Sequence, residues 1–152
     1  MKSRIYNTES EEETIALGEE LAAELPPQAV VLLIGQIGAG KTTLAKGIVN
    51  GLGAALPDDV SSPTFTLIHE YSPSVFHIDL YRLDTAAQVA TLGLEEIFDR
   101  RAVVLIEWGE RFPELMPENR IEIRIRTLET KTGGEETKPG GENSRQIELR
   151  VQ

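Results

Sequence analysis

The sequence predicts a three-layer α/β fold, in which helices cover both faces of a central, mainly parallel sheet. Two continuous apolar runs, at residues 30–34 and 102–106, are typical of strands that are buried on both faces. Helical apolar patterns lie between the strands, and such alternation favours parallel pairing with right-handed crossovers. The length of 152 residues indicates a single domain that spans residues 1–152.

The first predicted element is an amphipathic helix that begins near Ser10. Ser10 and Glu13 have the S-x-x-E spacing of a capping box, which satisfies free backbone N–H groups of the first helical turn. Pro26 and Pro27 end this helix, because proline has no N–H group to donate and its ring clashes with the preceding turn. The apolar face consists of Leu17, Leu21, Ala22 and Leu25.

The apolar run at residues 30–34 is the first predicted strand of the sheet. Glycines follow it directly, and a second amphipathic helix follows the glycines. Gly51 or Gly53 ends this helix, since glycine readily adopts the left-handed conformation found just after helices. The apolar face of this helix consists of Leu44, Ile48, Val49 and Leu52.

The middle of the chain contains two more predicted strands with a short helical region between them. Residues 75–81 form one strand, and the apolar run at 102–106 forms the other. Residues 84–99 indicate one or two short helices, with Asp84 as the N-terminal cap.

The C-terminal region has a different pattern, in which apolar and charged residues alternate. The alternation covers residues 121–126 and 146–151 and predicts two strands that are solvated on one face. We expect them to pair as an antiparallel hairpin at the edge of the sheet, with acidic and basic side chains opposite one another. Residues 127–145 between them have few apolar side chains to bury, so they are predicted to form a mobile loop.

Composition narrows the class of function. The net charge of −10 argues against DNA or another nucleic acid as a direct, tight partner, because phosphate binding needs clustered Lys and Arg. No apolar run approaches the roughly 18 residues of a membrane span, so we expect no membrane partner. The chain has no cysteine, which excludes disulfides and thiolate metal sites and favours a cytoplasmic location.

The strongest functional signal is the glycine-rich segment Gly35–Thr42, which reads G-x-x-x-x-G-K-T between the first strand and the second helix. Its backbone N–H groups and the positive end of the helix can surround phosphate oxygens. Lys41 supplies a cation for the β and γ phosphates, and Thr42 supplies a hydroxyl for Mg²⁺. The motif therefore predicts a P-loop NTPase that binds a magnesium nucleotide, with ATP as the expected nucleotide. The predicted nucleotide-binding residues of this segment are Gly35, Gly38, Ala39, Gly40, Lys41, Thr42 and Thr43.

Two carboxylates near the ends of predicted strands are candidates for magnesium chemistry. Asp79 lies in H-I-D-L-Y-R, and Glu107 ends the strand V-V-L-I-E. Either acid can hold Mg²⁺ through a water or orient an attacking water, and spacing leaves open which acid does which. Together with Lys41, they are the candidate catalytic residues. His77 is interpreted as a packed or hydrogen-bonded strand residue.

These motifs together resemble the bacterial TsaE (YjeE) family. The resemblance is carried by G-x-x-G-A-G-K-T-T, S-P-T-F, H-x-D-L-Y-R and I-E-W, which occur in this order between Gly35 and Trp108. It implies a P-loop fold and hydrolysis of ATP in support of the threonylcarbamoyl modification of adenosine 37 in tRNA. It also implies two protein partners, TsaB and TsaD, through which the chain would meet tRNA indirectly.

The resemblance also implies roles for individual residues. Thr42 and Glu107 correspond to the magnesium contacts, and Asp79 corresponds to a second essential acid. Thr64 corresponds to a hydroxyl on a switch loop, and Trp108 to a functionally sensitive tryptophan.

Three further positions bear on the resemblance. Glu11 and Arg145 correspond to additional nucleotide contacts. Gln36 departs from the family, which usually has Asp after the first glycine of the loop. The departure leaves the phosphate-binding backbone intact and removes the acid that would order a metal or contact a partner at this position.

Two other functions fit the same loop. A small nucleoside or nucleotide kinase shares it, although no arginine-rich lid is evident in the sequence. A non-hydrolysing adaptor that reports ATP against ADP to a partner would share it as well. A GTPase is disfavoured, because the chain has no N-K-x-D segment to bind guanine.

Overall fold

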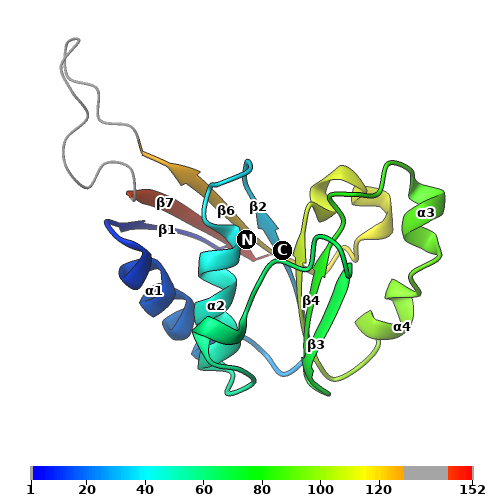
Figure 1. The fold of residues 1–152 in the computed structure, drawn as a ribbon, viewed down its shortest axis with the longest axis horizontal. Coiled ribbons are helices and arrows are strands. Elements are labelled where there is room, and N and C mark those ends of the chain that lie inside the picture. The colour runs from blue at the N-terminus through cyan, green and yellow to red at the C-terminus, as the bar shows by residue number, and fades with distance from the viewer. Residues whose placement is uncertain (1, 129–143, 152) are drawn as a thin grey trace, which may run out of the picture.

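The computed structural model describes residues 2–128 and 144–151 and is organised around one sheet (Figure 1). Within these residues the sheet has seven strands in the order β1-β7-β6-β2-β5-β4-β3. The strands are β1 (Lys2–Thr8), β2 (Ala29–Ile34), β3 (Ile68–Ser72), β4 (Val75–Asp79), β5 (Val103–Glu107), β6 (Ile121–Thr127) and β7 (Arg145–Val151). The helices are α1 (Glu11–Glu24), α2 (Lys41–Gly51), α3 (Ala86–Ala90) and α4 (Leu94–Phe98), with 3₁₀ turns at η1 (Pro57–Asp59), η2 (Gly109–Arg111) and η3 (Pro113–Leu115).

Strands β6, β2, β5 and β4 are parallel and form the centre of the sheet, while β1, β7 and β3 pair antiparallel. The sheet is therefore mixed rather than mainly parallel. The predicted hairpin of β6 and β7 exists, but its position at the edge is wrong, because β1 pairs with β7 and forms the outer strand. An alternation of apolar and charged residues indicates that one face of a strand is solvated. It does not indicate whether another strand pairs with its edge.

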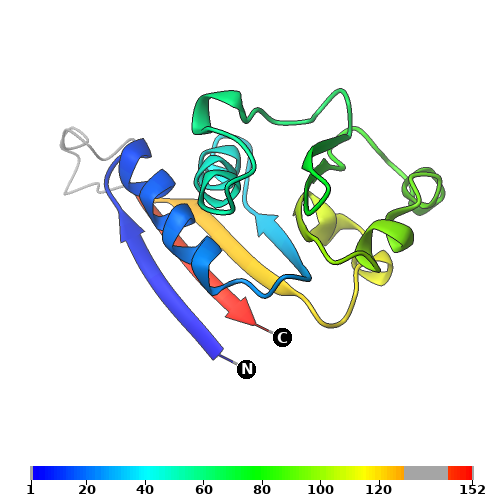
Figure 2. The same ribbon diagram turned by 90° about the horizontal axis from the view of Figure 1, so that it is seen from below.

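Helices cover both faces of the sheet, as predicted (Figure 2). Val31 and Leu33 of β2 point into the core beneath α1 and α2. Val30 and Leu32 of the same strand point into the opposite core, which is closed by α3, α4 and the 3₁₀ turns. The continuous apolar run of β2 is thus explained by a strand whose two faces are both covered.

Helices α1 and α2 pack against each other through glycines. Gly47 approaches α1 so closely that a Cβ atom placed on it would lie 2.1 Å from the carbonyl oxygen of Ile15. The start of α1 agrees with the predicted cap, since the Ser10 hydroxyl accepts a hydrogen bond from the N–H of Glu13 at 3.1 Å. The carboxylate of Glu13 accepts from the N–H of Glu9 instead of Ser10, at 3.2 Å.

The short helices on the other face differ from the sequence prediction in their cap. Thr85, and not Asp84, caps α3: its side chain accepts from the N–H of Gln88, whose side chain accepts in return from the Thr85 N–H. This reciprocal pair is a full capping box, which a single acidic cap does not supply. Among the described residues, none of the helices has the length and apolar character that crossing a bilayer requires.

The predicted mobile loop at 127–145 lies mostly outside the described residues. Its two ends are described: Thr127 ends β6, Arg145 begins β7, and the two residues are paired across the strands. The hairpin ladder therefore continues up to the last described positions on both sides.

Candidate active site

A cavity of about 370 Å³ opens over the glycine-rich loop, at the carboxyl ends of the parallel strands. In open α/β sheets this is the side on which ligands bind. The cavity brings together most of the residues predicted from the sequence. Those that line it are Glu11, Gly38, Gly40, Lys41, Thr42, Thr43, Thr64, Asp79, Glu107, Trp108 and Arg145.

Two predicted binding residues, Gly35 and Ala39, do not line this cavity and instead border a second pocket beside β6. The carbonyl oxygen of Gly35 accepts a hydrogen bond from Lys41, and Ala39 is buried against Gly35. A Cβ atom on Gly35 would lie 2.6 Å from the carbonyl oxygen of Ile125, so the loop passes β6 where only glycine fits. Gly40, with φ of 108°, turns the chain into α2 in a conformation that other residues rarely adopt.

The Lys41 side chain lies inside the site although it carries a charge. Its Nζ atom donates to the Gly35 carbonyl oxygen at 2.6 Å and lies 3.5 Å from the centroid of the Trp108 ring. Only 5% of the residue is exposed, and this burial lowers the pKa of Lys41. The nearby charges of Glu107, Glu110 and Asp79 oppose that shift, because they favour the ammonium form.

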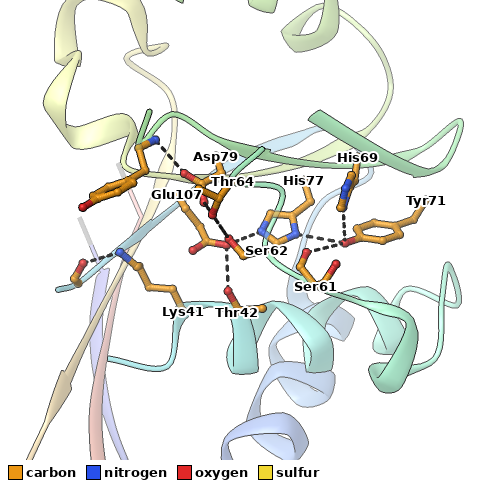
Figure 3. Close-up of polar contacts among 12 residues, drawn as sticks. Lys41, Thr42, Ser61, Ser62, Thr64, His69, Tyr71, His77, Asp79 and Glu107 are labelled. Carbon is orange, nitrogen blue, oxygen red and sulfur yellow. Dashed lines mark hydrogen bonds and ion pairs between the residues drawn. The ribbon is translucent and has the colours of Figure 1, made fainter. Parts of the chain in front are cut away.

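Glu107 ends β5 and is 3% exposed. Its Oε2 atom lies 2.6 Å from Nε2 of His77 and accepts a longer hydrogen bond, 3.4 Å, from the hydroxyl of Thr42 (Figure 3). His77 is therefore a hydrogen-bonded strand residue, as predicted. These contacts join the start of α2 to the end of β5 and the middle of the neighbouring strand β4.

Asp79 ends β4 and faces Glu107 across the parallel pairing of β4 and β5. Its Oδ2 atom accepts hydrogen bonds from the hydroxyls of Ser62 at 2.8 Å and Thr64 at 3.0 Å. Its Oδ1 atom accepts from the N–H of Tyr81 at 2.8 Å. The loop segment that carries Ser62 and Thr64 is thus tied to this carboxylate (Figure 3).

Trp108 follows Glu107 with φ of 67°, an uncommon conformation for a residue with a side chain. Its ring lies over the ammonium of Lys41, and its centroid is 5.2 Å from that of the Tyr81 ring. A strained backbone that aims an aromatic ring at a buried cation is a feature that clusters at functional sites.

Glu11 and Arg145 reach the cavity from opposite ends of the chain. Glu11 lies in the first turn of α1, and Arg145 begins β7. A Cβ atom on Gly40 would lie 3.4 Å from Nε of Arg145, so the guanidinium group lies beside the glycine-rich loop. Both residues therefore line the same cavity as Lys41 and Thr42.

Four lining residues were not predicted as site residues: Thr14, Ile37, Ser62 and Tyr81. Ser62 and Tyr81 belong to the motifs S-P-T-F and D-L-Y-R, in which a neighbouring residue was predicted as a site residue. Ile37 occupies a variable position of the loop motif, and Thr14 lies one turn into α1. No sequence pattern distinguishes Ile37 or Thr14 as a site residue.

The oxygen atoms that line the site suit a hard cation. The Thr42 hydroxyl uses its one proton toward Glu107, and its lone pairs stay available as a ligand. Carboxylates and a hydroxyl are the ligand types that Mg²⁺ takes, usually one or two from the protein with phosphate oxygens and waters completing the shell. Thr42, Glu107 and Asp79 therefore fit this ion.

Comparisons with known proteins agree on one family. The sequence profile described as "Threonylcarbamoyl adenosine biosynthesis protein TsaE" matches residues 8–136. A tRNA threonylcarbamoyladenosine biosynthesis protein TsaE of Bacillus subtilis (strain 168) is 40% identical over 129 residues, 83% of this chain and 79% of the relative. The TsaE protein of Rickettsia conorii is 36% identical over 128 residues, 82% of this chain and 72% of the relative. A crystal structure of Bacillus subtilis YdiB superposes with a TM-score of 0.74 at 31% identity, covering 99% of this chain and 86% of that one. The chain therefore belongs to the TsaE family of tRNA threonylcarbamoyladenosine biosynthesis proteins.

Proposed function

We propose that this chain is a P-loop ATPase that binds Mg-ATP over the glycine-rich loop and hydrolyses it in tRNA threonylcarbamoyladenosine biosynthesis. One observation carries the proposal: a buried ammonium, a hydroxyl and two carboxylates from different elements line a single cavity above that loop. This is the set of groups that phosphoryl transfer to water requires. The biosynthetic setting comes from the family, and TsaB and TsaD are the proposed protein partners.

The triphosphate would lie along the loop, with its oxygens facing the N–H groups at the start of α2. No side chain caps this helix end, because Gly40 occupies the cap position. The positive end of the helix therefore faces the cavity uncovered by a cap, which is a favourable place for an anion. The ammonium of Lys41 would exchange the Gly35 carbonyl for phosphate oxygens, a stronger pairing of opposite charges.

Thr42 and Glu107 are proposed to hold the magnesium ion, with Asp79 reaching it through a water. When bound, Mg²⁺ would neutralise charge that develops on the phosphate oxygens. Thr42 can donate its proton to Glu107 while it offers a lone pair as ligand, so their contact at 3.4 Å is compatible with both tasks. The hydrogen bonds from Thr42 and His77 both go to Oε2 of Glu107. We propose that its other oxygen, Oε1, orients the attacking water.

Thr64 is proposed to sense the terminal phosphate. It now donates to Asp79, and both residues line the cavity. A terminal phosphate oxygen within reach would compete with Asp79 for the Thr64 proton. Exchange of that hydrogen bond is the kind of loop rearrangement by which nucleotide switches distinguish triphosphate from diphosphate.

Fluorescence titration tests the binding step. Trp108 is the one tryptophan of the chain, and its ring lies over the lysine of the loop. We expect Mg-ATP to change the fluorescence in a saturable way and Mg-GTP to change it much less. Equal responses to the two nucleotides would contradict the choice of ATP, and no saturable response to either would contradict the proposed function.

Hydrolysis measured alone, with the TsaB–TsaD pair, and with the pair and tRNA tests the catalytic step. We expect slow turnover by the isolated chain and faster turnover in the complex. Phosphate release to water distinguishes this function from a kinase, which would transfer phosphate to a nucleoside supplied in the assay. Binding without turnover under every condition would instead support a non-hydrolysing adaptor.

A further inference from the structure

A chain of polar side chains continues behind Glu107, away from the cavity (Figure 3). His77 of β4 lies 2.6 Å from Glu107, and its other ring nitrogen, Nδ1, lies 3.3 Å from the hydroxyl of Tyr71 on β3. The Tyr71 oxygen also lies 3.4 Å from the carbonyl oxygen of Ser61 and 3.4 Å from Nδ1 of His69. The antiparallel pairing of β3 and β4 builds this arrangement, because it places His69 directly opposite His77.

Proton accounting along this chain selects one tautomer of His77. The short contact with the Glu107 carboxylate requires a proton on Nε2, since a carboxylate can only accept. A neutral imidazole with its proton on Nε2 must accept at Nδ1. The hydroxyl of Tyr71 faces Nδ1 and can donate there. Tyr71 has only one proton, so at a given moment it serves His77, the carbonyl of Ser61, or Nδ1 of His69 where that nitrogen carries no proton.

We propose that Tyr71 and His77 are positioning residues for Glu107: Tyr71 donates to Nδ1 and supports the His77 ring, and His77 holds the carboxylate in the orientation that hydrolysis needs. The inference deepens the proposed function and rests on it. His77 is fully buried, so the orientation of its ring depends on packing and on the hydrogen bonds to Glu107 and Tyr71. Neither residue lines the cavity, so both act through Glu107.

The same hydroxyl connects Glu107 to the loop that holds Asp79. Ser61, whose carbonyl oxygen lies near Tyr71, directly precedes Ser62, which donates to Asp79. The segment therefore holds Asp79 directly, and its Ser61 carbonyl competes with His77 for the Tyr71 proton. A shift of this segment that pulls the Tyr71 proton toward Ser61 would remove the hydrogen bond that supports the His77 ring.

Steady-state kinetics of Tyr71→Phe tests the proposal, because this change removes one hydroxyl and leaves the ring. We expect kcat for ATP hydrolysis to fall about tenfold, as is common when the partner of a ligating side chain is lost. Affinity for Mg-ATP, read from Trp108 fluorescence, should stay within about twofold, because Tyr71 makes no contact in the cavity. Tyr6→Phe is the matched control, since Tyr6 lies on β1 at the opposite edge of the sheet and should retain wild-type turnover.

Two His77 variants separate positioning from packing. His77→Gln keeps an N–H donor for Glu107 but has no ring nitrogen to accept from Tyr71, whereas His77→Leu removes the donor. We expect His77→Gln to retain more turnover than His77→Leu, and we expect Tyr71→Phe to have no further effect when it is added to His77→Gln. Effects that multiply in the double variant, or a Tyr71→Phe variant that turns over like the wild type, would overturn the proposal.

Nitrogen NMR of the imidazole rings gives a readout that does not depend on hydrolysis. The chain has two histidines, so the spectrum of His69→Gln assigns the signals of His77. We expect His77 to be the Nε2–H tautomer in the wild type and in Tyr71→Phe, because the Glu107 carboxylate is the acceptor in both. The Nδ1 signal should shift in Tyr71→Phe, because that nitrogen loses its hydrogen-bond donor. A wild-type His77 with its proton on Nδ1 alone would overturn the inference and leave the proposed function standing. Mg-ATP binding with the expected tautomer but with no hydrolysis, alone or with partners, would overturn the proposed function and with it the hydrolytic role of this pair.

Discussion

At the scale of single residues, the site depends on charges that the fold buries and then pairs. Glu107 and Asp79 lie side by side at the ends of neighbouring strands. One oxygen of each carboxylate accepts hydrogen bonds from hydroxyl or imidazole groups. Buried carboxylates stay ionised only where such donors or a cation compensate the loss of water. Lys41, placed between the loop and Trp108, supplies the cation.

Replacing Glu107 by glutamine tests its proposed role in orienting water. The amide keeps the size of the side chain but cannot accept a proton from water, so we expect turnover to fall by roughly 100-fold or more. Mg-ATP binding should survive, since the Lys41 and loop N–H groups that we propose to contact the phosphates are unchanged. Single-turnover hydrolysis together with a Trp108 titration measures both quantities. Glu118→Gln, an exposed position, is the control, and an unchanged rate in Glu107→Gln would reject Glu107 as catalytic.

Glu110 predicts a pH dependence of stability. Its Oε1 atom is buried with no hydrogen-bond partner among the described residues, and burial raises the pKa of Glu110 above the ordinary 4.5. The folded protein therefore holds this proton to higher pH than the unfolded chain, so the free energy of unfolding falls as pH rises through the interval between the two pKa values. We expect Glu110→Gln to be more stable than the wild type above that interval.

Urea unfolding measured at several pH values, from about one unit below the ordinary pKa of 4.5 up to neutral pH, checks this sign. The gain in Glu110→Gln should shrink toward the acidic end, where the wild-type carboxyl group is protonated in both states. Glu114→Gln provides the control, because Glu114 is exposed in the following 3₁₀ turn. A gain that grows toward low pH would contradict the assignment.

At the scale of elements, the pairing of α1 with α2 fixes where the glycine-rich loop ends. The two helices meet at Gly18 and Gly47, where an added Cβ atom on either residue would enter the backbone of the other helix. Helix α2 begins at Lys41, so a displacement of α2 would move the N–H groups and the lysine that face the cavity.

We expect Gly47→Ala to lower the free energy of unfolding by about 2–3 kcal/mol, because the new methyl group overlaps the rigid backbone at Ile15. Chemical denaturation measures this loss. Gly53→Ala is the comparison: that glycine has φ of 74° and open space around it, so the change costs only the conformational strain of about 1 kcal/mol. Equal losses in the free energy of unfolding of the two variants would show that the close contact between α1 and α2 adds nothing to the cost of the Gly47→Ala change.

The elements differ in how readily they could be predicted. Strands β2 and β5 and helices α1 and α2 were predicted because their apolar residues repeat with a clear period or run. Strands β1 and β3 were missed, since β1 reads KSRIYNT and β3 reads IHEYS, with few apolar residues in either. Both strands lie at sheet edges, where one side of the strand has no neighbouring strand. An edge strand can form with few apolar residues, so its sequence pattern is weak.

At the scale of the whole molecule, the cavity is assembled from segments that are distant in sequence. Helix α1, the glycine-rich loop, the Ser62–Thr64 segment, the ends of β4 and β5 and the start of β7 all contribute lining residues. A ligand that contacts so many elements binds the folded chain and not the unfolded one. It must then stabilise the fold as a whole.

Thermal unfolding with and without Mg-ATP measures this linkage. At a nucleotide concentration of 100 times Kd, binding adds about 2.7 kcal/mol. For a domain of this size that corresponds to a rise in Tm of about 5–10 °C. Lys41→Ala should unfold at a Tm that nucleotide raises far less, because the cation that we propose to contact the phosphates is gone. An equal rise in both proteins would place the nucleotide somewhere other than this loop.

Sequence by itself determined the glycine-rich loop, the strand before it, the helix after it and the candidate acids, because these features depend on the backbone freedom of glycine and on short apolar patterns. Only the tertiary structure decided that β1 closes the sheet edge and that His77 holds Glu107. It also decided that Arg145 lies beside Gly40. Those contacts join residues at least 30 positions apart, and their distances follow from strand order and helix packing, which the core as a whole sets.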